Sequence, residues 1–119
     1  MTISPTEFEL LVEEALASLP KRFADLLDNV AVVVEEEPDD GDLDALEDEH
    51  SELLGIYRGT ALTRRTHDML PALPDTIAIF RGPILRVSRN RREAVRQIRQ
   101  TVIHEFGHYF GLSDHDMHY

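Results

Sequence analysis

Apolar side chains recur at helical spacing near the start of the chain. Ser4 and Glu7 have the spacing of a capping box, and Pro5 suits the first turn of a helix. The apolar positions that follow are three or four residues apart and form one stripe: Phe8, Leu11, Val12, Ala15, Leu16 and Leu19. This pattern predicts an amphipathic helix that begins near Pro5 and ends before Pro20.

Shorter apolar runs predict strands in the middle of the chain. Residues 30–34 are rich in valine and indicate a buried strand, after a turn at about residues 23–28. Residues 54–57 and 76–80 are further candidates, the latter preceded by the prolines of a loop. Gly82 and Pro83 predict a turn, and residues 84–87 then predict another short strand.

The strongest helical pattern lies near the end of the chain. Asn90 is a good N-cap, with Glu93 three residues later. Apolar residues then follow at helical spacing: Ala94, Val95, Ile98, Val102 and Phe106. Gly111 suits a left-handed C-terminal cap, so we expect the helix to end near it. At 119 residues, we expect the whole chain, 1–119, to form one domain.

Charge is distributed very unevenly along the chain. Residues 1–60 carry 17 acidic and 3 basic side chains, net −14, whereas residues 61–119 carry 6 acidic and 9 basic, net +3. An acidic chain is a poor nucleic-acid binder, because phosphate contacts need a concentrated cationic face. The asymmetry predicts two halves that attract each other, or a mobile acidic loop. Arg92, Arg96 and Arg99 share a helical face and predict a solvated basic stripe, placed to meet the acidic segment, rather than a docking site.

Acidic residues dominate the segment at about 35–52. The run at 40–44 resembles the start of a calcium loop, but an EF-hand would need glycine and glutamate where Ala45 and Ser51 stand. We therefore expect a solvated, mobile acidic loop.

The composition also limits the compartment. There is no cysteine, which excludes disulfides, thiolate metal sites and cysteine nucleophiles. We see neither a signal peptide nor an apolar run long enough to cross a bilayer. These features favour a cytoplasmic protein that does not associate with membranes.

The predicted C-terminal helix contains the sequence H-E-x-x-H, from His104 to His108. Side chains four residues apart stand one turn above each other, so the two imidazoles can bind one Zn²⁺. Glu105 lies on an adjacent face, where it can accept the proton of a water activated by the metal. This spacing predicts one zinc per chain, with His104 and His108 as ligands and Glu105 as general base. His50 and His67 have no such partner pattern, and chance accounts for both.

A catalytic zinc usually has three protein ligands and one open position. With eleven residues after His108, we expect the third ligand from the segment that follows rather than from a later helix. Gly111 lets the chain turn back towards the metal, and Asp114 then has the favoured register. His115, Asp116 and His118 remain rivals. Stabilisation of the oxyanion would need a further group, and candidates near the motif are Tyr109, His115, His118 and Tyr119.

Three segments resemble the small bacterial zincin-like metallopeptidases, or minimal zincins: residues 73–77 (LPDTI), 80–84 (FRGPI) and 104–114 (HEFGHYFGLSD). The resemblance covers the C-terminal half strongly, and the N-terminal half only by length and element order. It implies an α+β domain with a small sheet beside the active-site helix, and Asp114 as third ligand. Larger relatives have a methionine-containing turn well downstream, whereas Met117 lies only three residues after Asp114.

The leading hypothesis is therefore a zinc-dependent peptidase. A chain of this size builds an exposed groove rather than a deep cleft, which suits a peptide or protein substrate in extended form along a sheet edge. The alternative is a metal-stabilised binding or regulatory domain without turnover, and a weaker one is an adaptor that uses the acidic surface. An open zinc position beside Glu105 distinguishes the peptidase from the binding domain.

Overall fold

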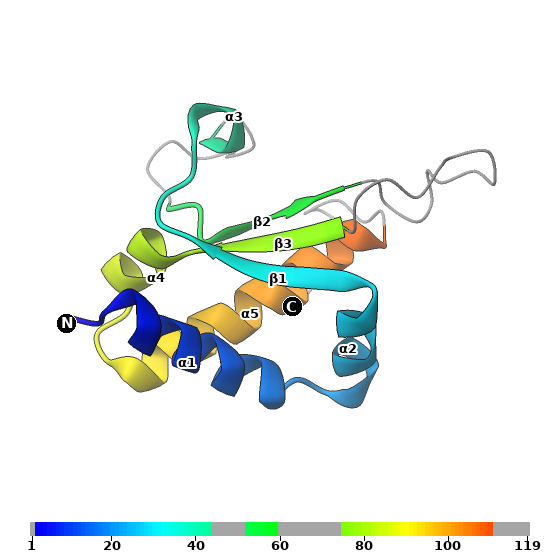
Figure 1. Cartoon of the computed structure of the whole chain (residues 1–119), viewed down its shortest axis with the longest axis horizontal. Coiled ribbons are helices and arrows are strands. Elements are labelled where there is room, and N and C mark those ends of the chain that lie inside the picture. Colours follow the sequence, from blue (N-terminus) through cyan, green and yellow to red (C-terminus); the bar gives the residue numbers. More distant parts are fainter. Residues whose placement is uncertain (1, 44–51, 60–74, 111–119) are drawn as a thin grey trace.

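The structure is a computed structural model that describes residues 2–43, 52–59 and 75–110 (Figure 1). In order, the elements are as follows: α1 (Pro5–Ala17), α2 (Lys21–Ala24), the 3₁₀ helix η1 (Asp25–Asp28), β1 (Val30–Glu35), α3 (Asp40–Leu43), β2 (Gly55–Arg58), β3 (Asp75–Phe80), α4 (Arg81–Val87) and α5 (Arg91–Tyr109). Together they form one domain of the α+β class, as the resemblance implies. No helix in these residues is long and apolar enough to cross a membrane.

The three strands form one mixed sheet with the order β1-β3-β2. β1 runs parallel to β3, and β2 runs antiparallel to β3. In the described residues β2 is therefore an edge strand. Helices α1 and α5 lie on one side of the sheet and the short helix α3 lies on the other (Figure 1).

Helices α1 and α5 have the caps that the sequence predicts. The Ser4 hydroxyl accepts a hydrogen bond from the Glu7 amide at 3.1 Å, and the Asn90 side chain accepts one from the Glu93 amide at 2.9 Å. The Glu7 carboxylate reaches Arg91 on α5 at 2.5 Å, so it also links the two helices. Both predicted helices are confirmed, and α5 ends at Tyr109, within two residues of the predicted end.

The apolar stripes of α1 and α5 meet the inner face of β3 in one core. Fully buried members include Phe8, Ile77, Ile79, Ile98, Val102 and Phe106. Phe23 of α2 stacks on Phe106 with ring centroids 6.0 Å apart. Each such side chain contributes roughly 1.5–3 kcal/mol through burial. Helix α5 is thereby fixed against the sheet along most of its length.

Three local predictions are wrong. Residues 84–87 are not a strand, and Gly82-Pro83 is not a turn, because all of them belong to helix α4. Pro83 is tolerated there, since amides in the first turn of a helix have no intrahelical acceptor to lose. The predicted turn at 23–28 is likewise helical, as α2 and η1.

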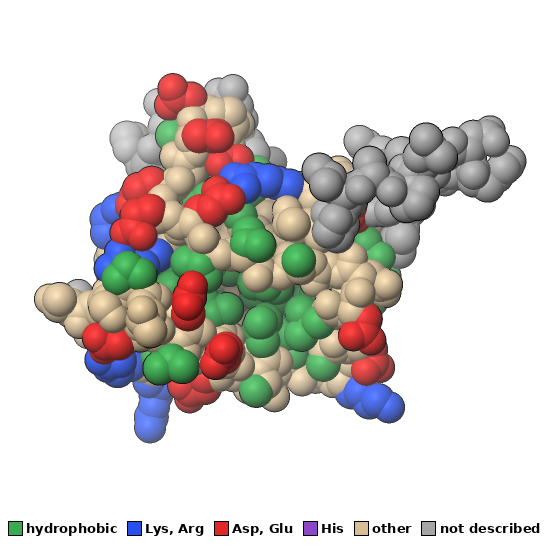
Figure 2. Space-filling model, viewed as in Figure 1, with side chains coloured by type: hydrophobic (Ala, Val, Ile, Leu, Met, Phe, Trp, Pro, Cys, Tyr) green, Lys and Arg blue, Asp and Glu red, His purple; other side chains and the backbone are tan. Residues whose placement is uncertain are grey.

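The acidic segment differs from the predicted solvated loop where the structure describes it. Glu35 ends β1, residues 40–43 form α3, and residues 44–51 lie outside the described part. Its carboxylates pair with arginines: Glu36 with Arg81, Glu37 and Glu52 with Arg86, and Glu35 and Asp42 with Arg58. Figure 2 shows these acidic side chains gathered near α3 and α4, with basic side chains between them. Arginine contacts therefore hold this part of the segment to the sheet and α4.

The basic stripe predicted on α5 takes no part in these pairs. Arg92 and Arg96 are exposed, and Arg99 donates to the Ser18 carbonyl at 3.4 Å. Arg81 and Arg86, which do pair with the segment, come from the second half of the chain. The expected attraction between the two halves is therefore present, and Arg81 and Arg86 of α4 provide it together with Arg91 of α5.

Candidate metal centre

Helix α5 brings two of the three predicted metal ligands, His104 and His108, together near its C-terminal end. His104 and His108 are half-buried, and their rings are 5.4 Å apart between centroids. One ligand atom from each of His104, Glu105 and His108 lies within 4.8 Å of the others. The arrangement follows from helical geometry, since residues four apart share a face.

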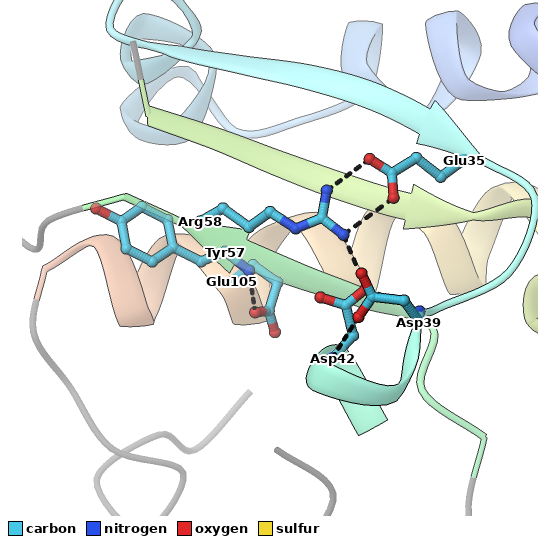
Figure 3. A network of polar contacts seen from close by, with 6 residues as sticks. All are labelled: Glu35, Asp39, Asp42, Tyr57, Arg58 and Glu105. Atoms are coloured by element: carbon cyan, nitrogen blue, oxygen red, sulfur yellow. Dashed lines mark hydrogen bonds and ion pairs between the residues drawn. The ribbon is translucent and has the colours of Figure 1, made fainter. Parts of the chain in front are cut away.

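Glu105 faces a different direction from the two histidines. It is 6% exposed, and its Oε1 accepts a hydrogen bond from the Tyr57 amide of β2 at 2.8 Å (Figure 3). Its Oε2 lies 3.9 Å from Nε2 of His104. The two carboxylate oxygens therefore have different neighbours, the edge strand for Oε1 and an imidazole for Oε2.

Strand β2 packs very closely against α5 at Gly55. Gly55 faces Thr101, which stands one helical turn before Glu105. A Cβ atom at Gly55 would lie 2.6 Å from the Thr101 methyl group and 2.8 Å from the Ala78 carbonyl oxygen. Real carbon contacts are optimal at about 3.5–4.0 Å, so only glycine fits at this point. The absence of a side chain at Gly55 lets β2 approach α5 closely enough for the amide of Tyr57, the next residue on the same face, to reach Glu105.

Tyr57 is also held through its side chain. Its hydroxyl donates to Oδ2 of Asp75 at 2.6 Å, and its ring meets the Tyr109 ring edge-on at 6.0 Å between centroids. Asp75, the first residue of β3, is 5% exposed. Gly59, at φ +151°, passes so close that a Cβ atom would lie 2.4 Å from the Asp75 carboxylate. Asp75 is thus enclosed by the end of β2.

On the opposite face of the sheet, Arg58 anchors β2 to the acidic segment. Its guanidinium donates to both oxygens of Glu35, at 2.5 and 2.9 Å, and to Asp42 at 2.8 Å (Figure 3). The Glu35 hydrogen bonds are the main reason that the pKa of Arg58 is raised further above its usual range. Burial alone would raise the pKa of Asp42, but hydrogen bonds from the Asp39 amide and Arg58 outweigh it and lower that pKa.

The other predicted site residues lie outside the described part of the chain: Gly111, Asp114, His115, Asp116, Met117, His118 and Tyr119. The third ligand therefore stays a prediction. Tyr57 and Asp75 were not predicted as site residues. They lie 48 and 30 positions before Glu105 in the sequence, and no local spacing rule links either to the motif. The only hint was that Tyr57 and Gly55 share one face of a predicted strand.

The described donors fit a zinc ion. Two imidazole nitrogens and a carboxylate are typical zinc ligands or neighbours, and ligand atoms within 4.8 Å of one another could surround a single ion. A buried carboxylate beside them matches the acid–base role that the spacing predicts. His104 and His108 would hold the metal, and Glu105 would stand next to it.

Known proteins resemble this chain at the level of family and of fold. The profile of the zincin-like metallopeptidases matches residues 27–119. A solved structure, that of a conserved hypothetical protein from T. thermophilus, superposes with a TM-score of 0.60 at 23% identity, over 91% of this chain and 94% of that one. At this identity the likeness shows the fold alone. No curated protein matches the chain. Because the family profile covers most of the sequence, the chain belongs to the zincin-like metallopeptidases.

Proposed function

We propose that this protein is a zinc-dependent peptidase in which Glu105 is the general base. The observation that carries the proposal is the placement of Glu105. It is buried, adjacent to His104, and has Oε1 held by the Tyr57 amide while Oε2 faces His104. A carboxylate used only for packing or solubility would not need this enclosure beside two metal-binding histidines.

His104 and His108 bind the metal in this proposal, and Asp114 completes the protein ligands, with one zinc per chain. Zinc supplies Lewis acidity, which makes a water nucleophilic near neutral pH and polarises a carbonyl group. Glu105 accepts the proton of the attacking water at Oε2 and transfers it to the leaving amine. Burial of Glu105 excludes bulk water from this transfer.

The substrate in this proposal is a peptide or protein segment in extended form. In the described residues β2 pairs with β3 on one side only, and an extended substrate would pair with its outer edge beside the Tyr57 amide, which Glu105 occupies. That edge lies directly beside Glu105, because the Tyr57 amide points towards it. A strand added there would place its backbone carbonyls close to the two histidines. The acidic chain does not suit nucleic acid, and we propose a cytoplasmic location.

The test compares metal content with hydrolysis. The purified protein should hold about one zinc per chain, and His104→Ala or His108→Ala should remove it. Wild type is screened against a peptide library and a digest of denatured protein. Glu105→Gln should keep the zinc and the thermal stability, and should lower kcat by roughly 10²–10⁴. Glu13→Gln, an exposed carboxylate on α1, is the matched control and should have no effect.

Two results would contradict the proposal. Equal hydrolysis by wild type and Glu105→Gln would exclude Glu105 as the base. Zinc held by four protein groups, with no hydrolysis of any library member, would instead identify a metal-stabilised binding or regulatory domain.

A further inference from the structure

The peptide N–H of Tyr57 points to the outer edge of the sheet. Neighbouring residues of a strand direct their backbone groups to alternate sides. The Leu54 carbonyl accepts from the Phe80 amide at 2.9 Å, so the backbone groups of Leu54 and Ile56 face β3. Tyr57 has the opposite parity, and its amide is directed away from β3, where Glu105 accepts it.

This single hydrogen bond distinguishes the two oxygens of Glu105. A glutamate side chain has three rotatable bonds, and on a helix it could direct either oxygen along several directions. The Tyr57 amide occupies Oε1 at 2.8 Å, and Oε2 is then left on the side of His104, 3.9 Å away. The oxygen that must accept a proton is therefore the one that the strand does not use.

The position of the Tyr57 amide is itself fixed from the other end of the residue. The Tyr57 hydroxyl donates to the buried Asp75 carboxylate at 2.6 Å, and its ring packs against Tyr109 of α5. Asp75 belongs to β3, so the side chain of Tyr57 is held by β3 and α5 together. Displacement of β2 along its axis would strain the hydroxyl contact and the amide contact together.

From these contacts we propose that Tyr57 is the positioning residue of the general base. Its amide orients Glu105, and its hydroxyl, bonded to Asp75, keeps strand β2 at the level where the amide meets Oε1. The role in hydrolysis rests on the peptidase function proposed above. The contact itself does not, because it can be measured without zinc or substrate.

The first experiment measures the contact in the whole protein. The chain has three tyrosines, so ¹⁵N-tyrosine labelling gives three amide resonances, and Tyr57→Phe identifies the one that belongs to Tyr57. In wild type this amide should exchange slowly with solvent. In Glu105→Ala the amide loses its acceptor, and its exchange should accelerate by about 10-fold or more. Urea denaturation of each variant separates a change in global stability from this local effect, and Glu13→Ala is the matched control.

The second experiment measures the consequence for hydrolysis. An ester at position 57, introduced with the α-hydroxy analogue of tyrosine, removes only the N–H and keeps the side chain. It should lower kcat by up to about 10²-fold, the scale of a reacting group misplaced by about 1 Å, with KM and zinc content little changed. Tyr57→Phe and Asp75→Asn should lower kcat in the same manner but less, because the amide remains.

Different outcomes of these two experiments contradict different parts of the proposal. A Tyr57 amide that exchanges equally fast in wild type and Glu105→Ala would overturn the contact, whatever the enzyme does. If that amide is protected by Glu105 but the ester variant keeps full kcat, the positioning role is overturned while the peptidase function stands. If wild type hydrolyses nothing, the peptidase function fails, and the exchange result alone decides whether Tyr57 holds Glu105.

Discussion

The close approach of β2 to α5 makes Gly55 sensitive to any added side chain. In Gly55→Ala the new Cβ atom would lie 2.6 Å from the Thr101 methyl carbon, 2.8 Å from the Ala78 carbonyl oxygen and 3.3 Å from Cδ1 of Ile79. Two of these contacts are about 1 Å too short. The Ala78 oxygen is backbone at the centre of the sheet, so the strand must move rather than a side chain.

We expect Gly55→Ala to lower the free energy of unfolding by roughly 1–3 kcal/mol, the usual cost of overpacking. Urea denaturation followed by circular dichroism measures this change. The second consequence is local, because Tyr57 stands only two residues away. Displacement of β2 should lengthen the Tyr57–Glu105 hydrogen bond and accelerate exchange of the Tyr57 amide beyond the global effect.

Two further variants make the reasoning testable. Thr101→Ser removes the nearest contact atom, so the double variant Gly55→Ala/Thr101→Ser should recover part of the loss, and the two effects should not add. Gly41→Ala is the matched control, because its nearest contact, Asp39 Oδ1 at 3.3 Å, can move with its side chain. If Gly55→Ala unfolds at the same urea concentration as wild type and Gly41→Ala, the close approach of β2 to α5 is refuted.

Two other predictions concern the third ligand and the acidic segment. Asp114→Ala should weaken zinc binding by more than about 100-fold, the upper range for loss of a supporting residue, and far more than Asp116→Ala or His118→Ala. Competition with a chelator measures the zinc affinity of each variant, and equal losses in the three variants would contradict the assignment. Asp42→Asn should cost about 1 kcal/mol at neutral pH, because Arg58 is partly exposed. Since the pKa of Asp42 is lowered in the folded protein, this contribution is complete above about pH 4 and is lost as the pH falls further. Urea denaturation at several pH values should therefore show wild type and Asp42→Asn converging in acid, with exposed Asp40→Asn as the control; a constant difference would contradict it.

The helices that could be predicted are those whose signals are local. Ser4 and Asn90 cap their helices through contacts three residues away, and the apolar stripes of both helices recur within a few turns. The three runs predicted as strands at 30–34, 54–57 and 76–80 are also present within about one residue. The H-E-x-x-H motif could also be predicted from local signals, since the relative placement of its side chains follows from helical spacing alone.

What could not be predicted depends on contacts between distant parts of the chain. Helix α4 forms where Gly82 and Pro83 indicate a turn, and there the Gly82 amide donates to the Glu36 carbonyl. The acidic segment was expected to be solvated because its charges repel one another locally. Its arginine partners come from β2 and α4, and no short stretch of sequence contains both a carboxylate and the arginine that pairs with it. The bond from Tyr57 to Glu105 spans 48 positions, and that from Tyr57 to Asp75 spans 18.

Helix α5 explains how so small a domain can hold a defined site. One stripe of the helix, which includes Ile98, Val102 and Phe106, is fully buried in the core. A second stripe, Thr101 and Glu105, meets the edge strand, and a third, His104 and His108, is half-buried and carries the proposed metal ligands. The three stripes belong to one rigid helix, so the core that fixes the first also fixes the orientation of Glu105, the proposed base, relative to His104 and His108. Precision at this site therefore needs one well-packed helix and one edge strand held at the right distance. Variants that move α5 or β2 should affect hydrolysis even when they touch neither zinc nor substrate.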